Sequence, residues 1–235
     1  MKQTVFILAA LLLGAFPLHS QFVTIPDAAF LRALIEAGVD INGDSLISHD
    51  EAELITYLDI EGSWEDGQSG EIKNMKGIEA FINLDTLRCS YNLIASLNLS
   101  RNTSLTFLRC NENQLTSLDV HACKALTKLD CDNNQLSSLD VSNNASLTNL
   151  QCWENHLSSL DVSDCNALAR LDCDYNQLSS LDVSNNTALK RINLRDNPTL
   201  HEVCVWTMPF PAEVVKISTE GSPNVYFTSD CSIGQ

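Results

Sequence analysis

A short acidic segment near the start of the chain carries the most specific donor pattern in the sequence. Residues 40–51, DINGDSLISHDE, place oxygen-bearing side chains at alternating positions through Asp40, Asn42 and Asp44, and the segment ends on Glu51. A hard cation such as Ca2+ prefers several oxygen ligands, which carboxylates, amides and backbone carbonyls supply. The spacing therefore predicts a calcium loop over residues 40–51.

The segment resembles the calcium loops of EF-hand and dockerin-type proteins. The resemblance implies five ligand residues, with Leu46 contributing its backbone carbonyl and Glu51 binding through both oxygens: Asp40, Asn42, Asp44, Leu46 and Glu51. Ser45 departs from the pattern, because glycine usually supplies the positive φ of the sixth position, and a non-glycine residue costs on the order of 1 kcal/mol there. The alternative is an acidic turn whose carboxylates only cap helices.

The flanking residues predict two helical pieces that hold this loop. PDAAFLRALIEAGV (26–39) indicates a helix with Asp27 as its N-cap and Gly38 as its terminator. Ser48 and Glu51 have the spacing of a capping box for a second helix. We expect residues 21–62 to form an N-terminal cap, in which a structural Ca2+ holds the helices against the first apolar triplet.

The composition restricts the class of partner. The chain has 235 residues with 30 Asp plus Glu against 14 Lys plus Arg, which gives a formal net charge of -16. Such a surface repels phosphate backbones and anionic lipid head groups. We therefore expect no nucleic-acid partner and no membrane insertion, while cations and basic proteins remain open.

Residues 1–20, MKQTVFILAALLLGAFPLHS, have the layout of a secretory signal peptide. Lys2 supplies the positive start, and the apolar stretch that follows is too short to span a bilayer. The alternative is a buried apolar helix. We expect the mature protein to be secreted, or located in the periplasm or at the cell surface.

A 21-residue repeat dominates the rest of the chain. The pattern Leu-x-x-Leu-x-Cys-x-x-Asn begins at five in-phase leucines, and a sixth copy at Leu189 keeps the spacing without the cysteine: Leu84, Leu105, Leu126, Leu147 and Leu168. Residues 129–144 and 171–186 differ only at Asn133 and Tyr175. A self-similar period of this length is typical of a solenoid, in which each coil buries its apolar residues against its neighbours.

The repeat resembles that of leucine-rich repeat proteins, and most closely the short exported kind, with repeats ending Leu-Asp-Val-Ser, that is common in Bacteroidetes-type bacteria. The resemblance implies a right-handed leucine-rich repeat solenoid, mainly of parallel β-strands with little helix. We expect the repeats to cover residues 63–203 and a C-terminal cap to cover residues 204–235. The recurrent asparagines and aspartates are predicted to bond the turns of the coils, since buried polar groups need partners.

The nine cysteines form three groups: five in a ladder, Cys123 with Cys165, which share a turn position two coils apart and lie beyond easy bridging, and Cys204 with Cys231. Five of them recur every 21 residues at a core position, and their parallel side chains keep the Cβ atoms further apart than a disulfide prefers. We expect these five to be free thiols that act as small hydrophobic residues. Cys204 and Cys231 bracket the C-terminal tail, and a disulfide between them would fasten a lid over the last coil.

One aromatic residue marks a candidate binding surface. Trp153 lies just after a ladder cysteine, at a column whose other members are small or charged, so we expect it to be exposed on the strand face. Exposed aromatic residues anchor interfaces. The neighbouring candidates for contacts with a basic peptide or with glycan hydroxyls are Asp130, Asp132, Asp172, Asp174 and Tyr175.

The sequence shows no catalytic constellation. No G-x-S-x-G, no phosphate-binding glycine loop and no H-E-x-x-H motif is present. Paired carboxylates such as Asp130 and Asp172 would need a cleft that excludes water before they resembled a glycosidase site. We therefore expect an exported, non-enzymatic interaction protein that binds a protein or glycan through the strand face. The alternative is a structural or envelope-associated spacer with no discrete site.

Overall fold

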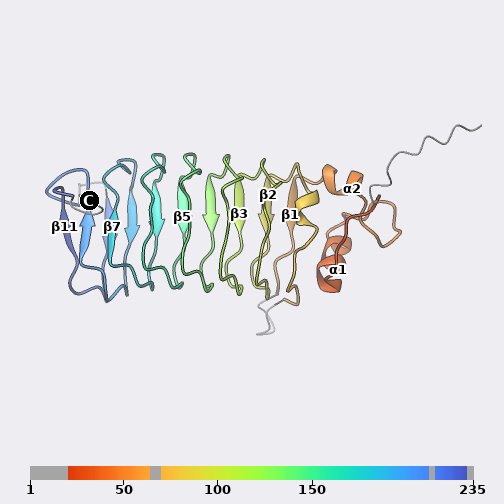
Figure 1. Ribbon diagram of the computed structural model, residues 1–235, viewed down its shortest axis with the longest axis horizontal. Helices are drawn as coiled ribbons and strands as arrows, with labels where there is room; N and C mark the ends of the chain where they lie inside the picture. Colours follow the sequence, from red (N-terminus) through yellow and green to blue (C-terminus); the bar gives the residue numbers. More distant parts are fainter. Residues whose placement is uncertain (1–20, 64–69, 212–214, 232–235) are drawn as a thin grey trace, which may run out of the picture.

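The computed structural model describes residues 21–63, 70–211 and 215–231, so the predicted signal peptide lies outside the described residues. The chain winds into coils that stack along one axis, with the helices at one end and the last strands at the other (Figure 1). No helix in the described part of the chain is both long and apolar enough to cross a membrane.

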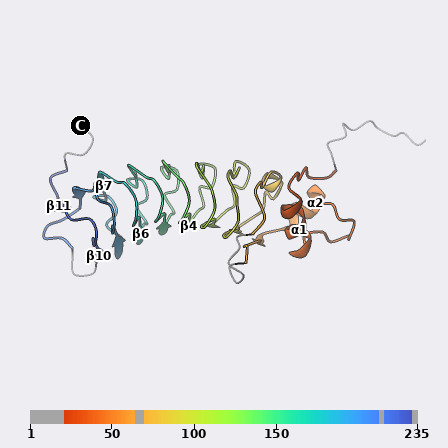
Figure 2. The same ribbon diagram turned by 90° about the horizontal axis from the view of Figure 1, so that it is seen from below.

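Short parallel strands line one side of the coils in an eight-stranded sheet of order β1-β2-β3-β4-β5-β6-β8-β10. The strands in chain order are β1 (Tyr57–Asp59), β2 (Thr86–Arg88), β3 (Phe107–Arg109), β4 (Lys128–Asp130), β5 (Asn149–Gln151), β6 (Arg170–Asp172), β8 (Arg191–Asn193) and β10 (Lys216–Ser218). Their register is in phase with the repeat, since Leu129 of β4 pairs with Leu108 and Leu150 on either side. Figure 2 shows β4, β6 and β10 along one side of the stack.

A second stack of extended segments runs along the opposite side of the coils. It contains β7 (Ser180–Asp182), β9 (Glu202–Cys204) and β11 (Tyr226–Thr228), which pair in the order β11-β9-β7. Single parallel bridges from Asp140 to Asp119 and to Asp161 extend the same row through the earlier coils. The predicted fold class, a mainly parallel leucine-rich repeat solenoid with little helix, is confirmed.

The core lies between the two stacks and contains the residues that the repeat predicted. In β2 to β6 the central leucine and the following ladder cysteine are fully buried, as Leu129 and Cys131 illustrate. Burial of each leucine contributes roughly 1.5–3 kcal/mol to folding. Seven cysteines are free and buried, and the Sγ of Cys131 donates to the carbonyl of Gln151 in the next coil at 3.4 Å.

The asparagine of each repeat joins adjacent coils, as predicted. The amide of Asn155 donates to the carbonyls of Cys131 and Cys152, both at 3.1 Å, and its oxygen accepts the N–H of Leu136 at 3.0 Å. Equivalent bonds recur along the stack. The residue before each of these asparagines has a positive φ between 49° and 57°, which turns the chain out of the strand: Tyr91, Glu112, Asn133, Glu154, Tyr175 and Asp196.

The N-terminal cap contains the two predicted helices, α1 (Ala28–Glu36) and α2 (His49–Leu54), and a 3-10 turn, η1 (Ile78–Ala80), opens the following coil. One oxygen of Asp27 caps α1 by accepting the N–H groups of Ala29 and Phe30. Its other oxygen accepts the N–H groups of Lys73 and Asn74, both at 2.9 Å, so one carboxylate ties the cap to the coil beside it. The capping box of Ser48 and Glu51 is present on α2.

The C-terminal segment continues the solenoid past the last full repeat. Ile217 of β10 pairs with Ile192 of β8, and Phe227 of β11 pairs with Val203 of β9, so both stacks gain one more coil. Cys204 and Cys231 form a disulfide with a Cα–Cα distance of 5.4 Å. This bond connects β9 to the residues just after β11.

Candidate functional site

The two faces of the solenoid differ in how much their outward residues change from coil to coil. On the second stack the outward pair is repeated as serine and aspartate, at Ser117 with Asp119, Ser138 with Asp140, Ser159 with Asp161, and Ser180 with Asp182. On the eight-stranded sheet the first and third residue of each strand point outward and differ in chemistry between strands. We call these outward positions, with the two residues after each ladder cysteine, the variable face. The first strand positions are Tyr57, Thr86, Phe107, Lys128, Asn149, Arg170, Arg191 and Lys216.

The structure places the predicted binding residues together on the variable face, at β4 to β6, but buries more of them than expected. Asp132, Asp172 and Asp174 are only 3%, 7% and 2% exposed. The expectation that these side chains lie on an open face is therefore wrong, because neighbouring coils about 4.8 Å apart cover each other's side chains. Trp153 and Asp130 are half-buried, whereas Tyr175 is 49% exposed.

Asp132 makes bonds to the coil that contains Trp153. Its Oδ1 accepts the backbone N–H of Trp153 at 2.8 Å, and its Oδ2 accepts the side-chain amide of Gln151 at 3.3 Å. Burial, reinforced by the nearby Asp130 carboxylate, raises the pKa of Asp132 to about 9. The carboxyl is therefore protonated at neutral pH and holds the coil in place rather than attracting a cation.

The other acidic candidates are also engaged within the protein. Asp174 accepts both the backbone N–H and the Nε–H of Arg195, each at 2.7 Å. Asp172 accepts the amide of Asn193 at 2.7 Å. The Oδ2 of Asp130 accepts the Nε–H of Arg109 at 3.2 Å. Their binding role stays a prediction, and the parts of this patch open to a partner are Tyr175 and the half-buried ring of Trp153.

Basic residues form a second feature of the variable face to which the sequence analysis assigned no role. The first strand positions from β4 onward are basic on four of five neighbouring strands: Lys128, Arg170, Arg191 and Lys216. Register pairs place Arg191 directly between Arg170 and Lys216. Lys216 was not foreseen in this row, because the spacing of the repeat changes before β10. We call these four residues the basic row.

The predicted calcium loop forms a compact turn between α1 and α2. Asp40 accepts the N–H groups of Gly43, Asp44 and Ser45, and Ser45 has the positive φ of 65° that its position requires. Glu51 closes the loop by accepting the N–H groups of Ile41 at 3.0 Å and of Ser48 at 2.9 Å. The hydrogen bonds from Ser48 hold the pKa of Glu51 below its ordinary value.

The loop contains the oxygen donors that Ca2+ prefers, but its carboxylate oxygens do not lie close enough together to surround one ion. In the described part of the chain, only one group of three His, Cys or acidic side chains has its ligand atoms within 4.8 Å of one another. That group is Asp182, Cys204 and Cys231. Those two thiols are joined in the disulfide, so that group is no metal site. Binding at residues 40–51 would require Glu51 to exchange backbone N–H partners for the ion.

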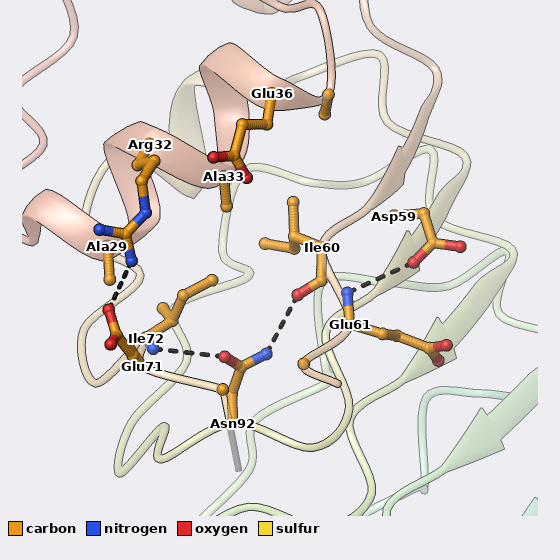
Figure 3. A pocket seen from close by; sticks show the side chains of 13 residues that line it. Ala29, Arg32, Ala33, Glu36, Asp59, Ile60, Glu61, Glu71, Ile72 and Asn92 are labelled. Carbon is orange, nitrogen blue, oxygen red and sulfur yellow. Dashed lines mark hydrogen bonds and ion pairs between the residues drawn. The ribbon is translucent and has the colours of Figure 1, made fainter. Parts of the chain in front are cut away.

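A cavity of about 310 Å³ lies between α1 and the first coils. The space is open because the residues of α1 that face it, Ala29 and Ala33, have small side chains. Three acidic residues also line it: Asp59, Glu61 and Glu71 (Figure 3). The one buried amide in its wall, Asn92, is already bonded to Ile60 and Ile72. The cavity is acidic, yet among the described residues that line it no buried side-chain polar atom lacks a hydrogen-bond partner.

Comparison with known proteins agrees with this architecture. A family model described as leucine-rich repeats (2 copies) matches residues 103–144. No curated protein matches the sequence significantly. The crystal structure of an internalin, InlF, from Listeria monocytogenes is similar at a TM-score of 0.54 and 24% identity, over 77% of this chain and 57% of that one.

Two further structures from Listeria monocytogenes are similar. Internalin C2 has a TM-score of 0.54 and 18% identity, over 88% of this chain and 95% of that one. The functional domain of InlJ, described as including a cysteine ladder, has a TM-score of 0.44 and 24% identity over 82% of this chain. The chain spans 60% of the InlJ domain and 57% of the InlF structure, less than two thirds of either. At these identities the likeness concerns the fold: the chain is a leucine-rich repeat solenoid, with residues 103–144 matching the repeat family.

Proposed function

We propose that the protein is an exported, non-enzymatic interaction protein that binds a protein or glycan partner through the variable face. The observation that carries this proposal is the contrast between the two faces. The second stack repeats serine and aspartate in coil after coil, while the variable face changes its outward residues from strand to strand. A spacer needs only the repeated framework, whereas recognition needs differing side chains at defined places.

The chemistry of the variable face favours binding over catalysis. Asp130, Asp172 and Asp174 are each held by donors of the protein itself, and Asp132 is protonated at neutral pH. An acid-base pair for hydrolysis needs one carboxylate free to take a proton from water and another positioned to donate one. The face instead offers exposed aromatic and basic side chains, which suit an interface.

A paired capture experiment tests the proposal. Tyr57 and Tyr175 are 55% and 49% exposed on the variable face, and glutamate already occupies the positive-φ position of Tyr175 in two other coils, at Glu112 and Glu154. We expect Tyr57→Glu with Tyr175→Glu to fold and to lose partners that the wild type captures from envelope and extracellular extracts. Trp153→Ala is a weaker probe, because the ring is half-buried and its removal also exposes its surroundings.

The matched control places the same two acids on the other face, as Ser138→Glu with Ser159→Glu, at exposed positions. Partners retained by the wild type and the control but lost by the tyrosine variant support binding through the variable face. Equal capture by all three proteins refutes that location. If the wild type captures nothing, the chain is a spacer without a discrete site.

We also propose that residues 40–51 bind a structural Ca2+ through Asp40, Asn42, Asp44, the Leu46 carbonyl and Glu51. Support comes from the donor set, from the positive φ of Ser45 and from the burial of Ile47, which is 1% exposed at the apolar position of the loop. The ion would neutralise the loop carboxylates between α1 and α2. Its role would be to stabilise the N-terminal cap.

A further inference from the structure

The strands that carry the basic row, β4, β6, β8 and β10, follow one another along the long axis of the solenoid (Figures 1 and 2). Its members occupy the same register position, so Lys128 pairs with Asn149, Asn149 with Arg170, Arg170 with Arg191, and Arg191 with Lys216. Lys128, Arg191 and Lys216 are exposed, and Arg170 is half-buried. The row is therefore a line of four basic residues, interrupted by Asn149, on the surface of a chain whose overall charge is -16.

The part of the row on neighbouring strands, Arg170, Arg191 and Lys216, is unfavourable in the protein alone. Adjacent strands lie about 4.8 Å apart, and like charges directly opposite each other on neighbouring strands destabilise a sheet. Within the described residues, the ion pair made by the row is that of Arg170 with Asp172, at 3.7 Å. The chain has 30 acidic residues available, yet Lys128, Arg191 and Lys216 stand unpaired there. An anion lying along the row would remove this repulsion.

The spacing and the surroundings indicate the shape of that anion. Strands β4, β5, β6 and β8 are hydrogen-bonded on both sides, so an extended peptide finds no free strand edge to pair with. Side chains on one face of an extended peptide repeat every ~6.7 Å, which does not match neighbouring strands about 4.8 Å apart. Sugar rings in an extended polysaccharide repeat at nearly the strand spacing, so one acidic group per ring keeps step with the row.

An apolar ring extends the row in the direction of the N-terminal cap. Phe107 of β3 pairs with Lys128 of β4 and is half-buried. Ligand sites commonly combine an aromatic surface with a few polar groups that fix orientation. A sugar ring that packs on Phe107 would place the acidic groups of the following rings over Lys128, Arg170 and Arg191.

We propose that the basic row, Lys128, Arg170, Arg191 and Lys216, binds an acidic polysaccharide, sulfated or carboxylated, lying along the axis of the solenoid. This inference rests on the proposed function of the variable face and names the class of partner. It assigns binding to the first strand positions, beside the predicted patch around Trp153.

The test measures binding of the purified protein, lacking the predicted signal peptide, to immobilised dextran sulfate, with uncharged dextran as the blank. The row variant combines Lys128→Gln, Arg191→Gln and Lys216→Gln and leaves the paired Arg170 in place. The control variant combines Lys73→Gln, Lys76→Gln and Lys124→Gln, three exposed lysines elsewhere on the chain. Both variants have the same net charge, so a difference between them reports position rather than overall charge.

We expect the row variant to bind dextran sulfate roughly tenfold more weakly than the wild type or worse, and the control to stay within about twofold, with wild-type binding weakening as salt rises. Absence of wild-type binding, or an equal loss in both variants, overturns the proposal. Binding of poly-glutamate as tight as that of dextran sulfate overturns the assignment to a polysaccharide and indicates an acidic protein segment. If the protein does not bind dextran sulfate, but its capture of partners from extracts still depends on Tyr57 and Tyr175, the proposed function is supported and this inference is wrong.

Discussion

At the scale of single residues, stacking changes the chemistry of side chains that would be ordinary on an isolated strand. The outward position of Asp132 becomes buried because the coils on either side cover it, and its pKa rises to about 9. Burial likewise raises the pKa of the Cys123 and Cys165 thiols to about 11. A buried thiol with a raised pKa is unreactive, so the seven free cysteines are compatible with the proposed export.

Asp132→Asn is expected to stabilise the protein at neutral and alkaline pH. Below about pH 4 the carboxyl carries its proton in both the folded and the unfolded chain, so it does not affect stability. Above this pH the unfolded chain loses the proton while the folded protein keeps it up to about pH 9, so the wild type loses stability across this window. Asparagine keeps the acceptor for the N–H of Trp153 and removes the titration. At pH 8 we expect a gain of at least about 1.4 kcal/mol in the free energy of unfolding, the equivalent of one pKa unit.

Asp140→Asn is the matched control for this measurement. Its pKa is lowered by the hydrogen bond from the N–H of Ser142, so its ionised form is favoured by folding. Replacement should therefore reduce stability slightly above its pKa, the opposite direction to Asp132→Asn. Denaturant unfolding at pH 4 and pH 8 distinguishes the two. Equal stability of Asp132→Asn and wild type at both pH values would show that the buried carboxyl titrates normally.

At the scale of elements, the loop between α1 and α2 is where ion binding and helix capping compete for the same carboxylates. Asp44→Asn is expected to reduce stabilisation by Ca2+, because it removes one ligand charge while an amide oxygen can still accept the N–H of Leu46. Wild-type protein should melt at a higher temperature in millimolar Ca2+ than in chelator, since a ligand that binds only the folded state stabilises it. Asp50→Asn, an exposed acid of α2 outside the ligand positions, should retain the effect. A melting temperature unaffected by Ca2+ in the wild type would leave residues 40–51 as a capping turn.

The sequence predicts well those structural features that depend on the spacing of residues within one repeat or one helix. The 21-residue period predicts the buried leucines and cysteines, and the asparagine column predicts the bonds between coils, because both depend on residues within one repeat and its neighbour. The spacing of Asp27 and of Ser48 with Glu51 predicts both helix starts. The burial of Asp132, Asp172 and Asp174 could not be predicted from alternation, because it depends on which side chains of adjacent coils lean over them.

At the scale of the whole molecule, a solenoid has two ends where the apolar core meets solvent, and each end is closed in a different way. Helices cover the first coil, and Phe30 and Leu34 of α1 are fully buried. The other end is closed by β10 and β11, which continue both stacks although the repeat has lapsed. Trp206, Phe210 and Phe227 pack there with ring centroids 5.2 and 5.3 Å apart. The sequence predicts a lid at this end, but the continuation of both sheets depends on long-range pairing that no local pattern records.

Cys231→Ser is expected to loosen this terminal coil and to lower the stability of the whole stack. The disulfide to Cys204 spans 27 residues, and closing a loop of that length stabilises a protein by about 3.5 kcal/mol through the unfolded chain. Each coil is stabilised by its neighbours, so fraying at one end exposes the next coil in turn. For the variant we expect the free energy of unfolding, measured with denaturant, to fall by about this amount. We also expect its backbone amides to exchange faster in β10 and β11 than in β4. Wild-type protein in reductant should match the variant, while an unchanged unfolding midpoint would show that the aromatic residues alone hold the lid.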